Sequence, residues 1–328
     1  MFASHLDPKV AAGTPDLVPS RNGYGDGLLE AGTRDELVVA LAADLTESTK
    51  TLPFAEAFPN RFVQMGIAEQ NMASVASGMA AMGKIPFIAS YAMFSPGRNW
   101  EQIRTTIAYN NVNVKVIGAH AGISVGPDGA THQAIEDIAL MRVVPNMVVI
   151  APCDVHEARK ATLVAAKYEG PVYIRLGRSE TPVVTTADSP FELGKGQILY
   201  TKNASLEKSV GIVVTGTLAY NALRAAADLE ALGIAATVLH LATVKPLDTA
   251  ALLELAMTHT ALVTVEEHQV AGGLGGAVAE YVSGVVPRKI IRLGIQDMFG
   301  QSGEPAELIE HYGLGINAIV TAGKQAVE

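Results

Sequence analysis

Short apolar runs alternate with helical stretches along this chain, and this alternation constrains its fold more than any other feature. From residue 37 the apolar runs have the length of buried strands, and the stretches between them have helical periodicity. The strand-like runs of the first half are residues 37–41, 61–65, 86–90, 112–117, 147–151 and 172–175, and its helical stretches include residues 99–109, 132–141 and 155–167. Such alternation predicts an α/β fold, with a largely parallel sheet covered by helices.

A second α/β unit follows the first. Its strand-like runs are residues 210–214, 235–239, 262–265 and 289–293, and its helical stretches are residues 219–232 and 275–282. With 328 residues, of which 49% are apolar, the chain can fill two cores. Apolar density falls at residues 181–196, which we interpret as the linker. We therefore predict a Gly- and Pro-rich N-terminal arm at residues 1–30, a first domain at 31–186 and a second domain at 187–328.

Charge and cysteine content limit the classes of partner. The formal net charge is −9 and no Lys- or Arg-rich tract occurs, which argues against nucleic acid or an anionic membrane as a partner. The single cysteine, Cys153, rules out an internal disulfide and any paired-cysteine metal motif. Residues 1–28 contain charged residues and no continuous apolar run, so we expect neither a signal peptide nor a spanning helix there. We expect a cytoplasmic protein.

A carboxylate stands where one strand-like run changes into a helix. Residues 62–65 predict a buried strand, Gly66 breaks it, and residues 73–81 are rich in the small side chains of a closely packed helix. Glu69 lies between them. Open α/β sheets bind ligands at the carboxyl ends of their strands, so Glu69 is a candidate catalytic acid. The competing interpretation is a surface glutamate in a first helical turn, where the helix dipole favours negative charge.

A Gly-rich loop at residues 120–133 follows a predicted strand and carries His120, Asp128 and His132. Loops in this position commonly carry function, and histidine is the usual side chain for proton transfer near neutral pH. A solvated loop with incidental histidines is the simpler alternative. Metal binding is less favoured, because the two histidines lack the short spacing of helical or finger sites.

Aromatic and arginine side chains follow other predicted strands. Tyr91 and Phe94 are either core or interface residues, or they flank a flat heterocycle by stacking. Arg34, Arg175 and Arg178 lie near the ends of predicted elements. A lone arginine in such a place is typically solvated or ion-paired, whereas two that converge on one cleft would clamp a phosphate.

Two Gly-rich segments invite a nucleotide-binding interpretation. Residues 25–27 (Gly-Asp-Gly) are a weak match, because no strand precedes them and no helix clearly follows. Residues 272–277 lie between a predicted strand and a helix, but they lack the full Gly-x-Gly-x-x-Gly spacing and a later acidic residue. We interpret them as helix–sheet packing or as an empty anion niche.

Several motifs together resemble the C-terminal half of a transketolase. The matching segments are residues 66–70 (Gly-Ile-Ala-Glu-Gln), Phe94, 128–133 (Asp-Gly-Ala-Thr-His-Gln), 245–248 (Lys-Pro-Leu-Asp), 265–268 (Val-Glu-Glu-His) and 297–303 (Asp-Met-Phe-Gly-Gln-Ser-Gly). The resemblance extends from residue 30 or so to residue 328. It implies a pyrimidine-binding domain for thiamine diphosphate, followed by a transketolase C-terminal domain.

The resemblance also implies a separate partner. In that family the other half binds the diphosphate and a divalent metal, Mg²⁺ or Ca²⁺, through a Gly-Asp-Gly motif that is followed by an asparagine pair. Residues 25–27 have no such pair before Asn60. The chain therefore resembles one subunit of a split transketolase that needs a diphosphate-binding N-terminal subunit. Self-association through its own two domains and a two-plus-two heterotetramer are expected from the family.

The resemblance implies roles for individual residues. Glu69 would hydrogen-bond the N1′ atom of the aminopyrimidine in a nearly dry pocket and promote its imino tautomer. His120 and His132 would act on the substrate beside it as the other catalytic residues. The remaining implied residues are Asp44, Ile67, Tyr91 and Phe94 at the cofactor, and Arg34, Ser48, His120, Asp128, His132 and Arg178 at the substrate. No residue of this chain is expected to bind the metal. Residues 95–97 (Ser-Pro-Gly) replace a third aromatic of the family, so that pocket wall differs.

By resemblance the chain is a subunit of an enzyme that transfers a two-carbon ketol unit between sugar phosphates, as in the pentose phosphate pathway. Two related alternatives are the β subunit of a 2-oxo acid dehydrogenase E1 component, which is not expected to carry residues 128–133, and the C-terminal half of a deoxyxylulose-phosphate synthase. An alternative from a different class of function is a non-catalytic scaffold. Such a protein has no physical need for Glu69 together with the loop residues His120, Asp128 and His132. A nicotinamide-dependent dehydrogenase would rest on residues 272–277 alone.

Overall fold

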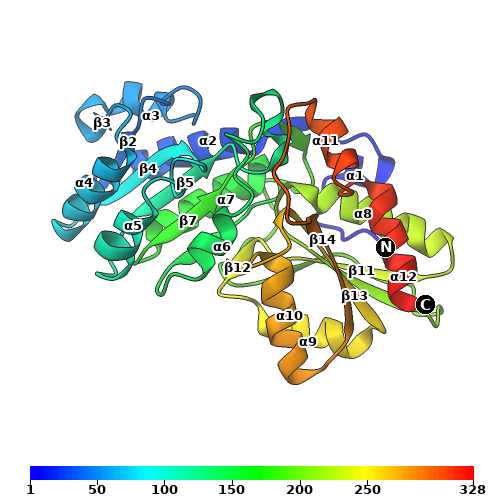
Figure 1. The fold of residues 1–328 in the computed structure, drawn as a ribbon. Coiled ribbons are helices and arrows are strands. Elements are labelled where there is room, and N and C mark those ends of the chain that lie inside the picture. Colours follow the sequence, from blue (N-terminus) through cyan, green and yellow to red (C-terminus); the bar gives the residue numbers. More distant parts are fainter.

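A seven-stranded sheet organises the first domain in the computed structural model, which describes residues 1–328 (Figure 1). Its strand order is β12-β6-β7-β5-β4-β2-β3, and every neighbouring pair is parallel except β12 with β6. The strands are β2 (Val38–Ala42), β3 (Phe62–Gln64), β4 (Ile85–Tyr91), β5 (Lys115–Ala119), β6 (Val148–Ile150), β7 (Val172–Arg175) and β12 (Thr243–Lys245). Strands β2, β5 and β7 are buried throughout, as in the middle of a parallel sheet that is covered on both faces.

Helices cover both faces of this sheet, as the alternation predicts. On one face α2 (Ser20–Arg34) packs along α7 (Val155–Lys167) and shares a core with the sheet. The other face is covered by α4 (Glu69–Ala81), α5 (Trp100–Gln102) with its π-helical continuation η2 (Ile103–Ala108), and α6 (Asp137–Arg142). Three short elements, α3 (Leu52–Ala57), η1 (Pro59–Arg61) and η3 (Ile123–Asp128), lie in the loops that follow β2 and β5.

The prediction of an N-terminal arm at residues 1–30 is wrong from residue 20 onward, because residues 20–34 form a helix of the first domain. These residues form α2, whose glycines are positions of close approach to α7. A Cβ atom on Gly23 would lie 1.9 Å from the carbonyl oxygen of Val155, and one on Gly27 would lie 2.8 Å from the Thr162 side chain. Residues 25–27 are helical, so the Gly-Asp-Gly segment is not a nucleotide-binding loop. Glycines that serve helix packing resemble those of a loop when only the sequence is read.

Residues 1–19 do extend from the first domain and pack on the second. Phe2 and Tyr200 form a β-bridge, and α1 (Pro8–Ala12) contributes to the core of the second domain. The short strand β1 (Leu17–Pro19) pairs antiparallel with β8 (Glu180–Pro182). In Figure 1 this segment, in blue, accordingly crosses to the side of α8 and α12.

The second domain contains a five-stranded sheet of order β14-β13-β10-β11-β9, which is parallel except for β9. Its strands are β9 (Gln197–Tyr200), β10 (Ser209–Val214), β11 (Ala235–His240), β13 (Ala261–Gln269) and β14 (Lys289–Ile295). One face is covered by α8 (Ala219–Ala231) and α12 (Ile316–Val327), and the other by α9 (Thr249–Thr258) and α10 (Leu274–Val285) (Figure 1). The remaining elements are η4 (Gly216–Leu218) and α11 (Pro305–His311), and α11 contacts η3 of the first domain. The predicted class, two α/β domains, is confirmed.

Some local predictions differ from the structure. The helix expected from residue 132 begins at Asp137, because the backbone of Ala134 pairs with residues 121 and 122 instead. Strand β3 is a partly exposed edge strand and not a buried one. The domain boundary predicted between residues 186 and 187 lies in the segment between β8 and β9. It stays a prediction, because β12 follows this boundary in the sequence and yet belongs to the sheet of the first domain. None of the helices has the length and apolarity that crossing a membrane requires.

Candidate active site

Glu69, the first residue of α4, lines a cavity of about 240 Å³. The residue is 2% exposed, which excludes a solvated first-turn glutamate. Its Oε2 atom accepts a hydrogen bond from Arg98 Nη1 at 2.7 Å, and its backbone carbonyl accepts one from Asn99 Nδ2 at 3.1 Å. The other carboxylate oxygen, Oε1, forms no hydrogen bond with the chain. Because Oε1 keeps its acceptor capacity free, it is available to a ligand in the cavity.

Three more of the predicted cofactor residues, Asp44, Ile67 and Phe94, line the same cavity. Asp44 has a left-handed backbone with φ of 61°, and its N–H donates to Gln64 Oε1 at 2.8 Å. Non-glycine residues in this conformation are held there by their surroundings and often lie at functional sites. Ile67 is 75% exposed, which leaves an apolar side chain at the rim for a ligand or another chain to cover.

Tyr91 lies between Phe94 and His120. Its ring stacks on the His120 imidazole with centroids 3.8 Å apart, and it lies nearly parallel to Phe94 at 6.1 Å. His132 approaches both aromatic rings edge-on, at 5.5 Å from Phe94 and 6.2 Å from Tyr91. The structure therefore brings together both aromatics and both histidines of the prediction. Tyr91 and Phe94 are half-buried, so neither is a core residue. Phe94 lines the cavity beside Glu69, whereas the part of Tyr91 in a cofactor site stays a prediction.

His120 is a buried and neutral imidazole. Its Nε2 atom lies 3.0 Å from Arg21 Nη1, and because a guanidinium can only donate, we infer that Nε2 accepts and that Nδ1 carries the proton. Nδ1 is buried without a hydrogen-bond partner. Burial, together with the positive charges of Arg21 and Arg178, lowers the pKa of His120 to about 3. The site therefore holds a neutral histidine with an unused donor.

Arg21 and Arg178 both face a second cavity of about 770 Å³. Arg21 lies in the first turn of α2 and donates to the Ser48 carbonyl at 2.9 Å, while Arg178 follows β7 and donates to the Val125 carbonyl at 2.7 Å. Neither arginine has a carboxylate partner within ion-pair distance. Burial and the charge of Arg178 lower the pKa of Arg21. Two guanidinium groups without ion-paired carboxylates favour an anion beside them, although Glu180, Glu267, Glu304 and Glu310 line the same cavity.

The prediction that Arg34 belongs to this site is wrong. Arg34 lies in the last turn of α2, at the opposite end from Arg21, and pairs with Glu30. Sequence reasoning does not find Arg21 as a candidate, because the Gly- and Pro-rich composition of residues 1–30 predicts an arm and hides the position of Arg21 at the start of a helix. Arg175 is also outside the site, since it forms a buried ion pair with Asp137 at 2.9 Å.

Asp128 lies exposed at the end of η3, and its carboxylate forms no hydrogen bond with the chain. It does not line either cavity. Its predicted contact with a sugar hydroxyl stays a prediction.

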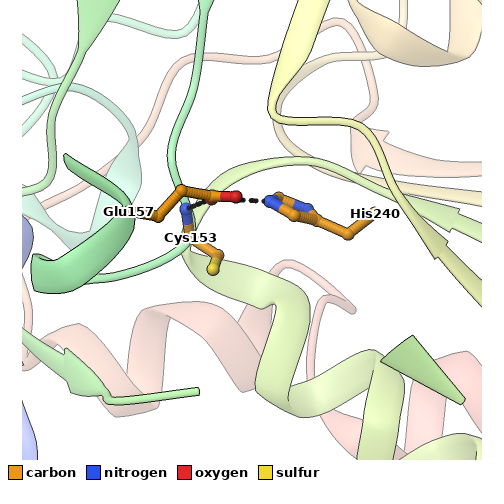
Figure 2. Close-up of side chains that lie close together, drawn as sticks. All are labelled: Cys153, Glu157 and His240. Atoms are coloured by element: carbon orange, nitrogen blue, oxygen red, sulfur yellow. Dashed lines mark hydrogen bonds and ion pairs between the residues drawn. The ribbon is translucent and has the colours of Figure 1, made fainter. Parts of the chain in front are cut away.

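Cys153, Glu157 and His240 form another buried cluster (Figure 2), with their potential ligand atoms within 4.8 Å of one another. The Glu157 carboxylate accepts hydrogen bonds from His240 Nε2 and from the Cys153 N–H, both at 2.7 Å. Burial and the neighbouring carboxylates raise the pKa of the Cys153 thiol, whereas a metal needs the thiolate. Because α7 supplies Glu157 and β11 supplies His240, we interpret the cluster as an ion pair that joins the two domains.

The Gly-rich segment at residues 272–277 begins α10, and a side chain of this protein fills its anion niche. The Glu266 carboxylate accepts hydrogen bonds from the N–H groups of Leu274 at 2.6 Å and Gly275 at 2.8 Å. A Cβ atom on Gly273 would lie 2.0 Å from Glu266 Oε2. Burial raises the pKa of Glu266 to about 7. The niche is occupied, so a dinucleotide phosphate has no place there.

Comparison with known proteins assigns both domains. The family model for the transketolase pyrimidine-binding domain matches residues 17–184, and that for the transketolase C-terminal domain matches residues 200–319. A protein of Methanocaldococcus jannaschii named as a transketolase C-terminal section is 46% identical over 297 residues, which are 90% of this chain and 92% of that protein. A 6-deoxy-6-sulfo-D-fructose transketolase subunit from Clostridium sp. (strain MSTE9) is 39% identical over 308 residues, 94% of each chain.

The structure is also similar to a solved split-gene transketolase, which is described as an inactive β4 tetramer. The TM-score is 0.86 and the identity 47%, and the match covers 94% of this chain and 98% of the other. The chain therefore belongs to the transketolase family, as a subunit of the split type that contains the pyrimidine-binding and C-terminal domains.

Proposed function

We propose that this chain is the C-terminal subunit of a transketolase that transfers a two-carbon ketol unit between anionic sugars. The observation that carries the proposal is the open oxygen of the buried Glu69, at a cavity walled by Phe94 and Ile67. Two arginines without counter-ions lie nearby, linked to this cavity through Tyr91 and His120. A scaffold protein has no physical need for such unsatisfied groups beside its cavities.

The cavity beside Glu69 fits the aminopyrimidine ring of thiamine diphosphate. Phe94 and Ile67 supply apolar walls, and Glu69 Oε1 supplies the acceptor that a ring N–H needs. When bound, thiamine diphosphate supplies the carbanion chemistry of its thiazolium ring. Glu69 would share a proton with the ring atom N1′, and Phe94 and Ile67 would keep water away from that proton. We assign the diphosphate and its Mg²⁺ or Ca²⁺ to a separate subunit, because the chain matches 94% of a relative named as a transketolase subunit and 98% of the chain of a split-gene transketolase.

The two arginines would hold the anionic end of the sugar. Arg21 and Arg178 keep donors free for it, and Ser48 fixes Arg21 through its carbonyl group. The neutral His120 can donate from Nδ1, while His132 and Asp128 would face the sugar hydroxyls. We propose a phosphate as the anion. A relative named for a sulfonated sugar shows that the anion can differ within the family, so the sulfonate is the alternative to be tested.

The test is turnover of xylulose 5-phosphate with ribose 5-phosphate, in the presence of thiamine diphosphate and Mg²⁺. The chain is assayed alone and then mixed with a diphosphate-binding transketolase subunit. We expect activity in the mixture and none with the chain alone. If the mixture binds the cofactor but turns over only a sulfonated donor, the anionic group of the substrate is a sulfonate and not the phosphate that we propose. A mixture that joins pyruvate to an aldose phosphate would support the deoxyxylulose-phosphate synthase alternative, and one that only decarboxylates 2-oxo acids would support the E1 alternative.

A further inference from the structure

Arg98 lies where the aromatic wall of the Glu69 cavity ends. The guanidinium carbon, Cζ, is 4.7 Å from the centroid of the Phe94 ring, and Nη1 is 2.7 Å from Glu69 Oε2. Arg98 also lines the same cavity, although 45% of its side chain is exposed. It follows residues 95–97, which stand where the family resemblance leads one to expect a third aromatic. A cation stacked on Phe94 therefore closes this side of the cavity.

The backbone next to Arg98 is attached to the helix that carries Glu69. Asn99 is fully buried, and its Nδ2 atom donates to the Glu69 carbonyl at 3.1 Å and to Ser95 Oγ at 3.2 Å. The Arg98 N–H donates to the Phe94 carbonyl at 3.1 Å. These contacts fix the backbone of residue 98 relative to Glu69 and Phe94. They do not involve the Arg98 side chain, so a substitution of Arg98 leaves them in place.

The carboxylate of a glutamate turns easily about its last torsion, which is broad and roughly two-fold. A single strong, charge-assisted hydrogen bond to one oxygen removes this freedom and fixes the direction of the other oxygen. At Glu69 the bonded oxygen is Oε2 and the unbonded one is Oε1. The guanidinium is itself confined by stacking on Phe94, so the direction of Oε1 is set by two contacts of the same arginine.

We propose that Arg98 is a positioning residue that orients the Glu69 carboxylate for the pyrimidine atom N1′ of thiamine diphosphate. This inference rests on the proposed function. Arg98 has this effect in two ways: its hydrogen bond orients the Glu69 carboxylate, and its stacking on Phe94 completes one wall of the cavity. A lysine at this position keeps the charge but loses the planar fork and most of the stacking, so it restores the orientation only in part.

The experiment uses the complex of this chain with the diphosphate-binding subunit. The variants are Arg98→Met, Arg98→Lys, Glu69→Gln and the double variant Arg98→Met/Glu69→Gln. Arg104→Met, which removes an exposed arginine of the neighbouring η2, is the matched control. Two quantities are measured without substrate: the dissociation constant of thiamine diphosphate by calorimetry, and the hydrogen–deuterium exchange rate at its thiazolium C2 atom by NMR.

We expect Arg98→Met to slow C2 exchange by about tenfold to a hundredfold, which is the effect of misplacing a reacting group. Arg98→Lys should recover part of this loss, and Arg104→Met should match the wild type. In the Glu69→Gln background, Arg98→Met should cause no further loss, because the two residues act as one unit.

Normal exchange in Arg98→Met, or an equal loss in both backgrounds, would overturn the positioning role while leaving the proposed function intact. A wild-type complex that neither binds thiamine diphosphate nor exchanges C2 would overturn the proposed function and this inference with it.

Discussion

Glu69 and Glu266 are buried carboxylates in the two α/β domains, and their hydrogen bonds distinguish a site from a scaffold. Glu266 gives one oxygen to each of two N–H groups at the start of α10. Glu69 gives one oxygen to Arg98 and leaves the other without a donor beside a cavity. A carboxylate with complete bonding holds its domain together, whereas one with an open oxygen can bind a ligand. We therefore base the proposed active site on the unused acceptor of Glu69 and not on the Gly-rich motif.

The largest expected effect comes from removing the open carboxylate. Glu69→Gln should lower kcat of the two-subunit complex by about 10²–10⁴-fold, the range for losing a general acid–base group. The amide keeps the size of the side chain, so folding should be preserved. Glu254→Gln, at an exposed position of α9, is the control and should retain full activity. Unchanged turnover of Glu69→Gln would remove the catalytic assignment.

Removing a carboxylate whose hydrogen bonds are all made within the chain should lower stability and not affect catalysis. Glu157→Gln breaks the buried pair with His240 and should lower the free energy of unfolding by about 3–5 kcal/mol, since it leaves one partner uncompensated. Thermal unfolding of the chain measures the loss. The fraction that remains folded should turn over normally in the complex. A variant as stable as the wild type would show that this pair does not join the domains.

The two ends of α2 offer the next comparison. Arg21→Met should raise KM for the anionic sugar by roughly 10–100-fold, because a charge-assisted hydrogen bond contributes about 1.5–3 kcal/mol. Arg34→Met at the other end removes an exposed pair with Glu30 and should leave KM unchanged. Steady-state kinetics of both variants would settle which arginine binds substrate. Equal effects of the two substitutions would contradict the placement of the anion site.

Glu266→Gln tests the closed niche directly. An amide group presents N–H donors to a site that already contains two backbone donors, which should cost about 1–3 kcal/mol of stability. Chemical denaturation of the chain gives this difference. Improved dinucleotide binding by the variant, detected by calorimetry, would instead restore the nucleotide interpretation of residues 272–277.

The smallest expected effect is a pH dependence of the pair between Glu157 and His240. Burial alone would lower the pKa of His240 and raise that of Glu157, but the pairing outweighs burial in both. Glu157 raises the pKa of His240 above its ordinary value of 6.5, and His240 lowers the pKa of Glu157 below its ordinary value of 4.5. The histidine's contribution is complete below pH 6.5 and is lost as pH rises through its folded pKa. The contribution of the Glu157 carboxylate to stability is present above pH 4.5 and is lost as the pH falls through the pKa of Glu157 in the folded protein.

The melting temperatures of the wild type and His240→Gln should therefore differ most between pH 4.5 and 6.5. A difference that stays constant with pH would contradict a charged pair.

Local sequence patterns were sufficient for the fold class and for part of the site. Strand and helix periods predict two α/β domains, and a break at a strand end places Glu69. They fail where packing determines the structure: the glycines of α2 resemble those of a loop, which hides the position of Arg21 at the start of a helix. Arg98 follows the aromatic pair in sequence, but only the folded chain shows its contact with Glu69. The niche at α10 is likewise filled from eight or nine residues upstream, a distance along the chain that motif reading does not test.

The most direct test of the account is hydrogen–deuterium exchange at C2 of thiamine diphosphate bound to the two-subunit complex. This exchange reports the proton transfer that the open oxygen of Glu69 is proposed to promote, and it needs no assumption about the sugar. We predict fast exchange in the wild-type complex and a loss of about a hundredfold or more in Glu69→Gln, with the cofactor still bound. Equally fast exchange in both complexes would contradict the central claim that Glu69 is the catalytic carboxylate.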